Sequence, residues 1–166
     1  MPKTLTHVTH GFSPVYDSRS RVLILGSMPS VKSREIRFYY GHPQNRFWRV
    51  LGAVLGTEFP ADSEGKRALL LEKHIALWDV IAECDIIGSS DSSVRNVIPN
   101  DLSVILDSAP IEAIFTNGGT ASRIYEKYQF PATGREAIPL PSTSPANAAW
   151  SEARLIEAWR VTADKL

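Results

Sequence analysis

Several residues in this 166-residue chain suit the binding of a flat ring with polar edges. Neighbouring tyrosines and a phenylalanine offer stacking faces, while two asparagines and an aspartate offer hydrogen bonds. This combination favours a nucleobase turned out of a nucleic-acid duplex, since such a base needs a stacking surface and partners for its edge. Each residue also has an ordinary alternative, because aromatic residues fill cores, asparagines cap helices and aspartates accept hydrogen bonds in turns. The residues concerned are Tyr39, Tyr40, Phe47, Asn45, Asn117 and Asp79.

Motifs for other common chemistries are missing from the sequence. There is no GxxxxGK[ST] phosphate loop, no GxGxxG dinucleotide fingerprint and no GxSxG nucleophile motif. The four histidines and the single cysteine, Cys84, show no metal-ligand spacing. One cysteine also excludes a disulfide framework and a four-cysteine iron–sulfur cluster. We therefore expect no metal and no other cofactor.

Basic residues lie beside the aromatic cluster and suit contacts to phosphate. The net charge of the chain is zero, yet five basic residues and one acid, Glu35, fall between positions 32 and 49. Most charge runs are solvated faces, but the position of this one makes phosphate contact a competing interpretation. The basic residues are Lys32, Arg34, Arg37, Arg46 and Arg49.

The elements that must position these residues alternate between strands and helices. Strands are expected over 21–25, 75–81, 111–116 and 137–140, and helices over 45–56, from Asp62-Ser63 towards 75, from Asn100 or Asp101 to about 109, over 120–128 and over 148–162. Residues 1–20, pinned by Phe12, Val15 and Tyr16, and residues 84–100 are expected to be irregular. The alternation predicts an α/β fold, a three-layer α/β/α sandwich with a central, mostly parallel four-stranded sheet, in one domain spanning 1–166.

Small or polar segments follow three of the predicted strands. They are Gly26 to Ser30, Asn117 to Gly119 and Pro141 to Ser144, and Asp79 lies near the end of the remaining strand. Because the carboxyl ends of parallel strands share one edge of a sheet, we expect these segments to meet there. The sequence has no apolar signal region and no run of about 20 apolar residues, so we expect a cytoplasmic protein. We also expect a monomer.

Three segments in order make the chain resemble the uracil-DNA glycosylase superfamily, most closely its hypoxanthine-DNA glycosylase branch. They are GSMPS at 26–30, HPQNRFW at 42–48 and LPSTSP at 140–145, and the resemblance extends from about Phe12 onward. It implies a four-stranded parallel sheet between helices and DNA containing a deaminated base as the partner. It also implies base flipping and monofunctional hydrolysis of the N-glycosidic bond in base excision repair.

The resemblance further implies roles for individual residues. The base pocket falls on Gly26, Ser27, Met28, Pro29, Tyr40, Asp79 and Asn117, with Tyr40 stacking on the base and Asp79 reading its edge. We expect DNA contacts from Ser30, Lys32, Ser33, Arg46, Ser142, Thr143, Ser144 and Pro145, the last four in a loop that enters the minor groove.

Two positions depart from the wider superfamily and narrow the expected activity. Many members carry Asp or Asn at the third position of the first motif, where this chain has Met28, which cannot orient water. The hypoxanthine branch implies that Asn45 takes over this catalytic role. Leu140 stands where the uracil-specific branch has a histidine, so efficient uracil excision is not expected.

Three alternatives remain beside excision of hypoxanthine. A relative preferring uracil or xanthine would share the same motifs. A non-catalytic nucleic-acid-binding module would explain Met28, and a hydrolase of free nucleosides would share the α/β pattern.

Overall fold

A parallel four-stranded sheet forms the centre of the computed structural model, which describes residues 4–166. Its strand order is β3-β2-β6-β7, and all its neighbouring pairs are parallel. Strands β2 and β3 are buried at every position, as continuous apolar runs in a covered parallel sheet require. The strand bounds are β2 Val22–Gly26, β3 Ile75–Asp79, β6 Ala113–Asn117 and β7 Ile138–Leu140.

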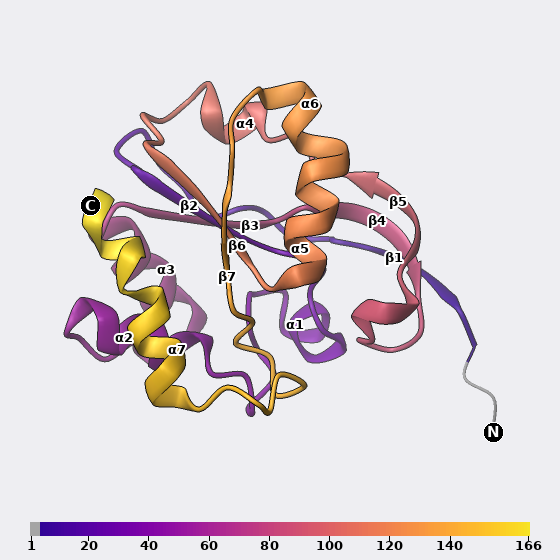
Figure 1. Ribbon diagram of the computed structural model, residues 1–166, viewed down its shortest axis with the longest axis horizontal. Coiled ribbons are helices and arrows are strands. Elements are labelled where there is room, and N and C mark those ends of the chain that lie inside the picture. Colours follow the sequence, from indigo (N-terminus) through magenta and orange to yellow (C-terminus); the bar gives the residue numbers. More distant parts are fainter. Residues whose placement is uncertain (1–3) are drawn as a thin grey trace.

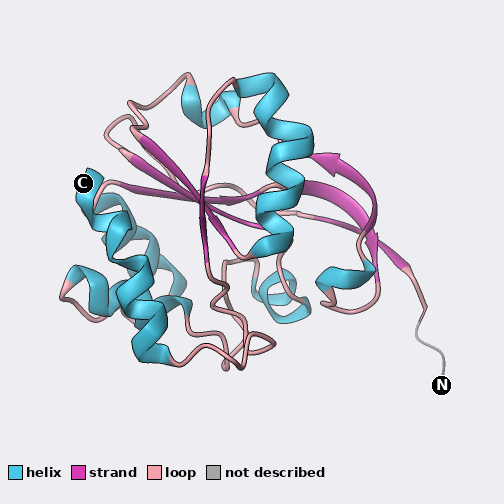
Figure 2. Ribbon diagram, viewed as in Figure 1, coloured by secondary structure: helices cyan, strands magenta, loops and turns pink. Residues whose placement is uncertain are grey.

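Helices cover both faces of this sheet and confirm the predicted α/β/α sandwich (Figures 1 and 2). On one side lie α2 (Phe47–Leu55), α3 (Ser63–Glu72) and α7 (Glu152–Trp159). On the other lie α5 (Gly119–Ile124) and α6 (Phe130–Thr133), joined by a π-helical turn, Tyr125–Gln129. The predicted cap of α3 is confirmed, because the Asp62 carboxylate accepts a hydrogen bond from the Gly65 N–H at 2.9 Å.

A second sheet, antiparallel and three-stranded, was not expected. It consists of β1 (Thr6–Thr9), β4 (Ile81–Ile86) and β5 (Arg95–Pro99), in the order β1-β4-β5. The predictions that 1–20 and 84–100 are irregular were therefore wrong in part, and residues 1–3 of the first segment lie outside the described residues. Polar residues alternate with apolar ones along these strands, since one face of an antiparallel sheet can be solvated, and this made them resemble loops.

Smaller differences affect the helices. The long connection after β2 contains a short helix, α1 (Val31–Ile36), capped by Ser30. The helix after residue 101 is a short one, α4 (Ser103–Leu106), and α7 starts at Glu152 rather than 148. Val15 is fully buried and bridges Leu77, which confirms that the N-terminal segment is pinned to the sheet.

The register brings the ends of the central strands together. Gly26 pairs with Asp79, and Asn117 pairs with Leu140. Leu25 pairs with Thr116, so Gly26 and Asn117 leave the sheet at the same edge. The predicted convergence is confirmed. In residues 4–166, no helix is both long enough and apolar enough to span a bilayer.

Candidate active site

A pocket of about 500 Å³ opens at this edge of the sheet. It combines the three loops that follow β2, β6 and β7 with a fourth loop between β4 and β5. Its lining residues are Gly26, Ser27, Met28, Pro29, Ser30, Ser33, Tyr39, Tyr40, His42, Asn45, Asp79, Ser89, Ser90, Asp91, Ser92, Asn117, Ser142, Ser144, Pro145 and Ala146.

Tyr40 forms an aromatic wall of the pocket: one face of its ring packs on Phe47, and the other face does not. Its ring stacks on Phe47 with centroids 3.9 Å apart and planes 12° apart, so a base can stack only on the opposite face. Its hydroxyl accepts a hydrogen bond from Asn117 Nδ2 at 3.2 Å. Burial and the nearby Asp79 carboxylate raise the pKa of Tyr40, so the phenol stays protonated.

Asn45 is held by a chain of hydrogen bonds that fixes the orientation of its amide. Its Oδ1 accepts from the Phe47 backbone N–H and from the Thr143 hydroxyl, each at 2.9 Å. Because a backbone N–H can only donate, the oxygen must be the atom turned toward Phe47. The amide nitrogen of Asn45 has no hydrogen-bond partner within 4–166, so Nδ2 is the donor that Asn45 offers to the pocket.

Asn117 extends this chain of hydrogen bonds, and both its amide nitrogen and its amide oxygen are engaged in it. Its Nδ2 donates to Thr143 Oγ1 at 3.0 Å as well as to Tyr40, and its Oδ1 accepts from the Thr143 N–H at 3.1 Å. The Thr143 side chain is fully buried. Asn117 and Thr143 therefore line or support the pocket by joining Tyr40 to Asn45.

Arg46 ties the second motif to the last loop. Its guanidinium donates to the carbonyls of Trp150, Ser144 and Asn147. Its backbone N–H donates to the Thr143 carbonyl at 3.1 Å. The arginine thus holds two loops of the pocket together, and its contact with DNA stays a prediction.

Gly26 has no room for a side chain. A Cβ at this position would overlap the Asp79 carboxylate and lie 2.9 Å from the Tyr40 hydroxyl. Only glycine therefore fits at this position of the predicted pocket floor without displacing Asp79 or Tyr40. Met28, at 9% exposure, adds an apolar part of the lining.

The remaining predicted DNA-contact residues lie in different settings. Ser30 caps α1 and accepts from the Ser33 N–H at 3.1 Å, while Ser33 is buried and accepts from the Gly41 N–H at 2.8 Å. Lys32 is exposed on α1 and does not line the pocket. Ser142, Ser144 and Pro145 line it, and their contact with DNA stays a prediction.

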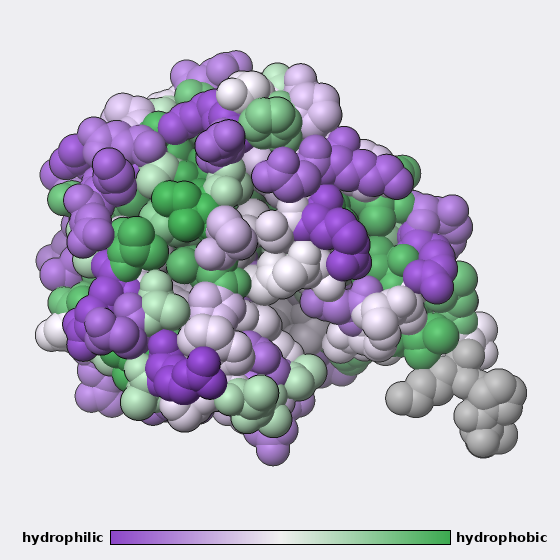
Figure 3. Space-filling view, in the orientation of Figure 1, coloured by the Kyte–Doolittle hydropathy of each residue, from purple (hydrophilic) through white to green (hydrophobic). Residues whose placement is uncertain are grey.

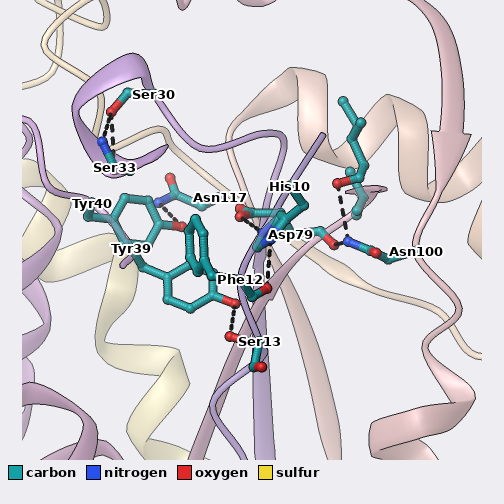
Figure 4. A network of polar contacts seen from close by, with 12 residues as sticks. His10, Phe12, Ser13, Ser30, Ser33, Tyr39, Tyr40, Asp79, Asn100 and Asn117 are labelled. Carbon is teal, nitrogen blue, oxygen red and sulfur yellow. Dashed lines mark hydrogen bonds and ion pairs between the residues drawn. The ribbon is translucent and has the colours of Figure 1, made fainter. Parts of the chain in front are cut away.

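His10 was missed by sequence reasoning. The histidine comes from the segment after β1, and its Nε2 lies 2.7 Å from Asp79 Oδ2 (Figure 4). Both residues are buried, at 5% and 4% exposure. No local signal could have found this pair, since its members are separated by 69 positions.

The loop between β4 and β5 was also missed as part of the pocket. Its serines 89, 90 and 92 and its Asp91 line the opening, and the Ser27 hydroxyl donates to Asp91 Oδ1 at 3.0 Å. Asp91 is exposed when the whole residue is considered, but its carboxylate lies against the pocket wall. Desolvation there raises the pKa of the Asp91 carboxylate. The density of serines in this polar stretch was the available signal. Among the described side chains, no three His, Cys, Asp or Glu residues group to hold a metal.

Comparisons with known proteins agree on one family. The family model described as the uracil DNA glycosylase superfamily matches residues 13–163. A hypoxanthine DNA glycosylase of Methanosarcina barkeri is 36% identical over 138 residues, covering 82% of this chain and 87% of the relative. A second one, from Methanosarcina acetivorans, is 34% identical over 148 residues, covering 89% and 93%.

A solved structure agrees with these sequence matches. It is a solution NMR structure of a candidate uracil DNA glycosylase from Methanosarcina acetivorans. It superposes with a TM-score of 0.76 at 35% identity, covering 92% of this chain and 96% of the other.

Proposed function

The chain belongs to the uracil DNA glycosylase superfamily and is a DNA glycosylase for deaminated bases, and we propose that hypoxanthine is its preferred base. The orientation of Asn45 carries the residue-level part of the proposal. An amide fixed by Phe47 and Thr143 leaves one donor, Nδ2, for the pocket.

The proposed reaction breaks the bond between C1′ of the deoxyribose and N9 of hypoxanthine. The bonding electrons leave with the base, the sugar becomes oxocarbenium-like, and the oxygen of a water bonds to C1′. A proton of that water passes to the departing base or to solvent. Asn45 holds the water by donating from Nδ2 to its oxygen, which leaves the second lone pair of the water for the attack. Position is sufficient here because the carbon is already electron-poor.

The same pocket provides the proposed base contacts. Tyr40 stacks on the flipped base, while Gly26 to Pro29 form the floor beneath it. Leu140 supplies no donor to a departing uracil, which favours hypoxanthine over uracil.

DNA contacts are proposed for the serine-rich rim. Ser142, Ser144 and Pro145 on the last loop and Ser30 on the first lie around the opening, where a phosphate backbone would pass. We propose that the protein acts as a monomer inside the cell, where this substrate is found, and that its glycosylase chemistry uses no cofactor.

Removal of the proposed donor tests the function. In a single-turnover assay with a hypoxanthine-containing duplex, the wild type should release the base and leave an abasic site. Asn45→Ala should lose most of this release while still binding the duplex. A binding module would release no base from any duplex, and a nucleoside hydrolase would cleave free deoxyinosine faster than the duplex.

A further inference from the structure

The buried pair of His10 and Asp79 lies at the floor of the pocket, which Asp79 lines, and has no role in the bond cleavage proposed above. Their side chains are each about 5% exposed, and Nε2 lies 2.7 Å from Oδ2. Figure 4 shows the two side chains facing each other beside Asn117 and Tyr40. An aspartate enclosed in this way needs a partner, and His10 provides it.

The contact made by the second ring nitrogen of His10, Nδ1, shows how many hydrogens the His10–Asp79 pair carries. Its Nδ1 lies 3.0 Å from the Phe12 carbonyl oxygen. A carbonyl can only accept, so Nδ1 must carry a hydrogen. The short contact on the other side then holds one proton, either on Nε2 of His10 or on Oδ2 of Asp79. Two bare lone pairs at that distance would repel each other.

Either position of this proton leaves the other carboxylate oxygen unprotonated. Oδ1 of Asp79 has no hydrogen-bond partner in residues 4–166, and it is not one of the fully enclosed polar atoms without a partner. It lies against Gly26, at the floor of the pocket. Asp79 therefore offers the pocket an acceptor and no donor.

We propose that His10 is a positioning residue for base selection: it keeps the shared proton between Nε2 and Oδ2, so that Oδ1 of Asp79 faces N1 of the bound base as an acceptor and binds a base that carries a hydrogen there. Hypoxanthine has such a hydrogen on N1, next to its carbonyl, whereas N1 of adenine carries a lone pair. The pair thus separates hypoxanthine from its parent base, adenine. Uracil and xanthine carry an equivalent N–H, so this contact does not rank the deaminated bases. This inference rests on the proposed function.

A purely structural role for the pair predicts a different outcome. The His10 ring packs against Phe12 and Tyr39, with centroids 4.5 and 5.8 Å away. Loss of packing alone would lower stability and weaken binding to all bases equally. Only a positioning role changes the preference between bases.

The test measures binding to duplexes that carry hypoxanthine or adenine on a 2′-fluoroarabino sugar, which resists hydrolysis. Wild-type protein should prefer the hypoxanthine duplex. His10→Phe keeps an aromatic ring but removes both nitrogens, and the preference should fall roughly tenfold, as for a lost contact to a buried polar group. The matched control is His7→Phe, a change of an exposed histidine outside the pocket, which should keep the preference.

Replacement of the carboxylate gives the sharper comparison. In Asp79→Asn, neutral His10 with its hydrogen on Nδ1 can accept from the new amide N–H at Nε2, which turns the amide oxygen to the pocket. This variant should keep most of the preference, and addition of His10→Phe should abolish it. Full preference in a folded His10→Phe variant, or equal loss in Asp79→Asn and His10→Phe, would overturn the proposal.

The protonation of His10 can also be tested on the wild-type protein, without a variant and without an activity assay. Nitrogen-15 NMR of the His10 ring should show a hydrogen on Nδ1, and a bare Nδ1 would overturn the proton count. The two proposals also fail separately. Selective binding without hydrolysis of ordinary deoxyinosine duplexes would refute the proposed function, whereas hydrolysis with an unchanged preference in His10→Phe would refute the role of His10.

Discussion

At Asn45, the free atom of the amide decides what the residue can contribute. Oδ1 is occupied by Phe47 and Thr143, so under our proposal Asn45 holds the water with a donor rather than with an acceptor. The third position of the first motif, Met28, contributes apolar surface only. The sequence predicted that Asn45 substitutes for that position, but not which atom acts.

Asn45→Asp tests the donor directly. A carboxylate can still accept from the Phe47 N–H and the Thr143 hydroxyl, so the loop should keep its structure. The donor, however, is replaced by an anionic oxygen, and excision of hypoxanthine should fall by roughly 10²-fold or more, as for other lost catalytic donors. Single-turnover rates measure this. An active Asn45→Asp variant would instead assign residue 45 to proton acceptance.

Gly26→Ala tests the close packing of the pocket floor. The added methyl group would overlap the Asp79 carboxylate and crowd the Tyr40 hydroxyl, displacing two proposed base contacts at once. We expect loss of most excision activity, measured in the same assay. Gly119→Ala is the matched control, since a Cβ there meets nothing within 4 Å. Equal activity of both variants would contradict this description of the floor.

At the scale of elements, the buried hydroxyl of Thr143 joins three segments that lie far apart in the sequence. Thr143 accepts from Asn117 and donates to Asn45. These contacts connect the ends of β6 and β7 to the start of α2. The position of the proposed catalytic amide thus depends on strands that lie far from it in the sequence.

Thr143→Val keeps the shape of the side chain but removes this connection. Asn45 and Asn117 each lose one of their hydrogen bonds in a partly buried setting, so the free energy of unfolding should fall by about 1–3 kcal/mol. Urea denaturation measures this, and the excision rate should fall as well. Thr143→Ser retains the hydroxyl and should restore both properties. If valine is tolerated as well as serine, the connection is not important.

The second sheet has its own pH dependence through His7. Hydrogen bonds to Asp85 and then Glu83, across β1 and β4, raise the pKa of His7. The folded protein thus binds this proton more tightly than the unfolded chain does. Its stabilisation is fully present below about pH 6.5 and is lost as the pH rises through the raised pKa. Urea midpoints should decline over this range, and the His7→Gln variant should lack that part of the decline.

Local patterns predicted the central sheet but not the second one. Strands β2 and β3 are continuous apolar runs, and two glycines mark the end of β6, so a short stretch of sequence was sufficient. The strands β4 and β5 alternate between polar and apolar residues, and their pairing with β1 is decided by tertiary contacts. His10 and Asp91 were missed for the same reason, because their places in the pocket depend on that sheet.

For the whole molecule, positive and negative charges balance, and basic residues are concentrated only in part of the chain, between positions 32 and 49. The net charge is zero, so the whole molecule has no positive excess that would attract DNA, and the proposed attraction depends on local groups. Figure 3 shows one face with many polar residues and small groups of apolar ones between them. Under our proposal, specificity depends on the pocket, where the stacking ring of Tyr40, the donor of Asn45 and the acceptor of Asp79 lie.

The most direct measurement is single-turnover base release from duplexes that differ only in one base: hypoxanthine, xanthine, uracil or adenine. We predict fastest release of hypoxanthine, slower release of xanthine and uracil, and retention of adenine. Bound hypoxanthine duplex without any base release, or release of uracil faster than hypoxanthine, would contradict the proposed function.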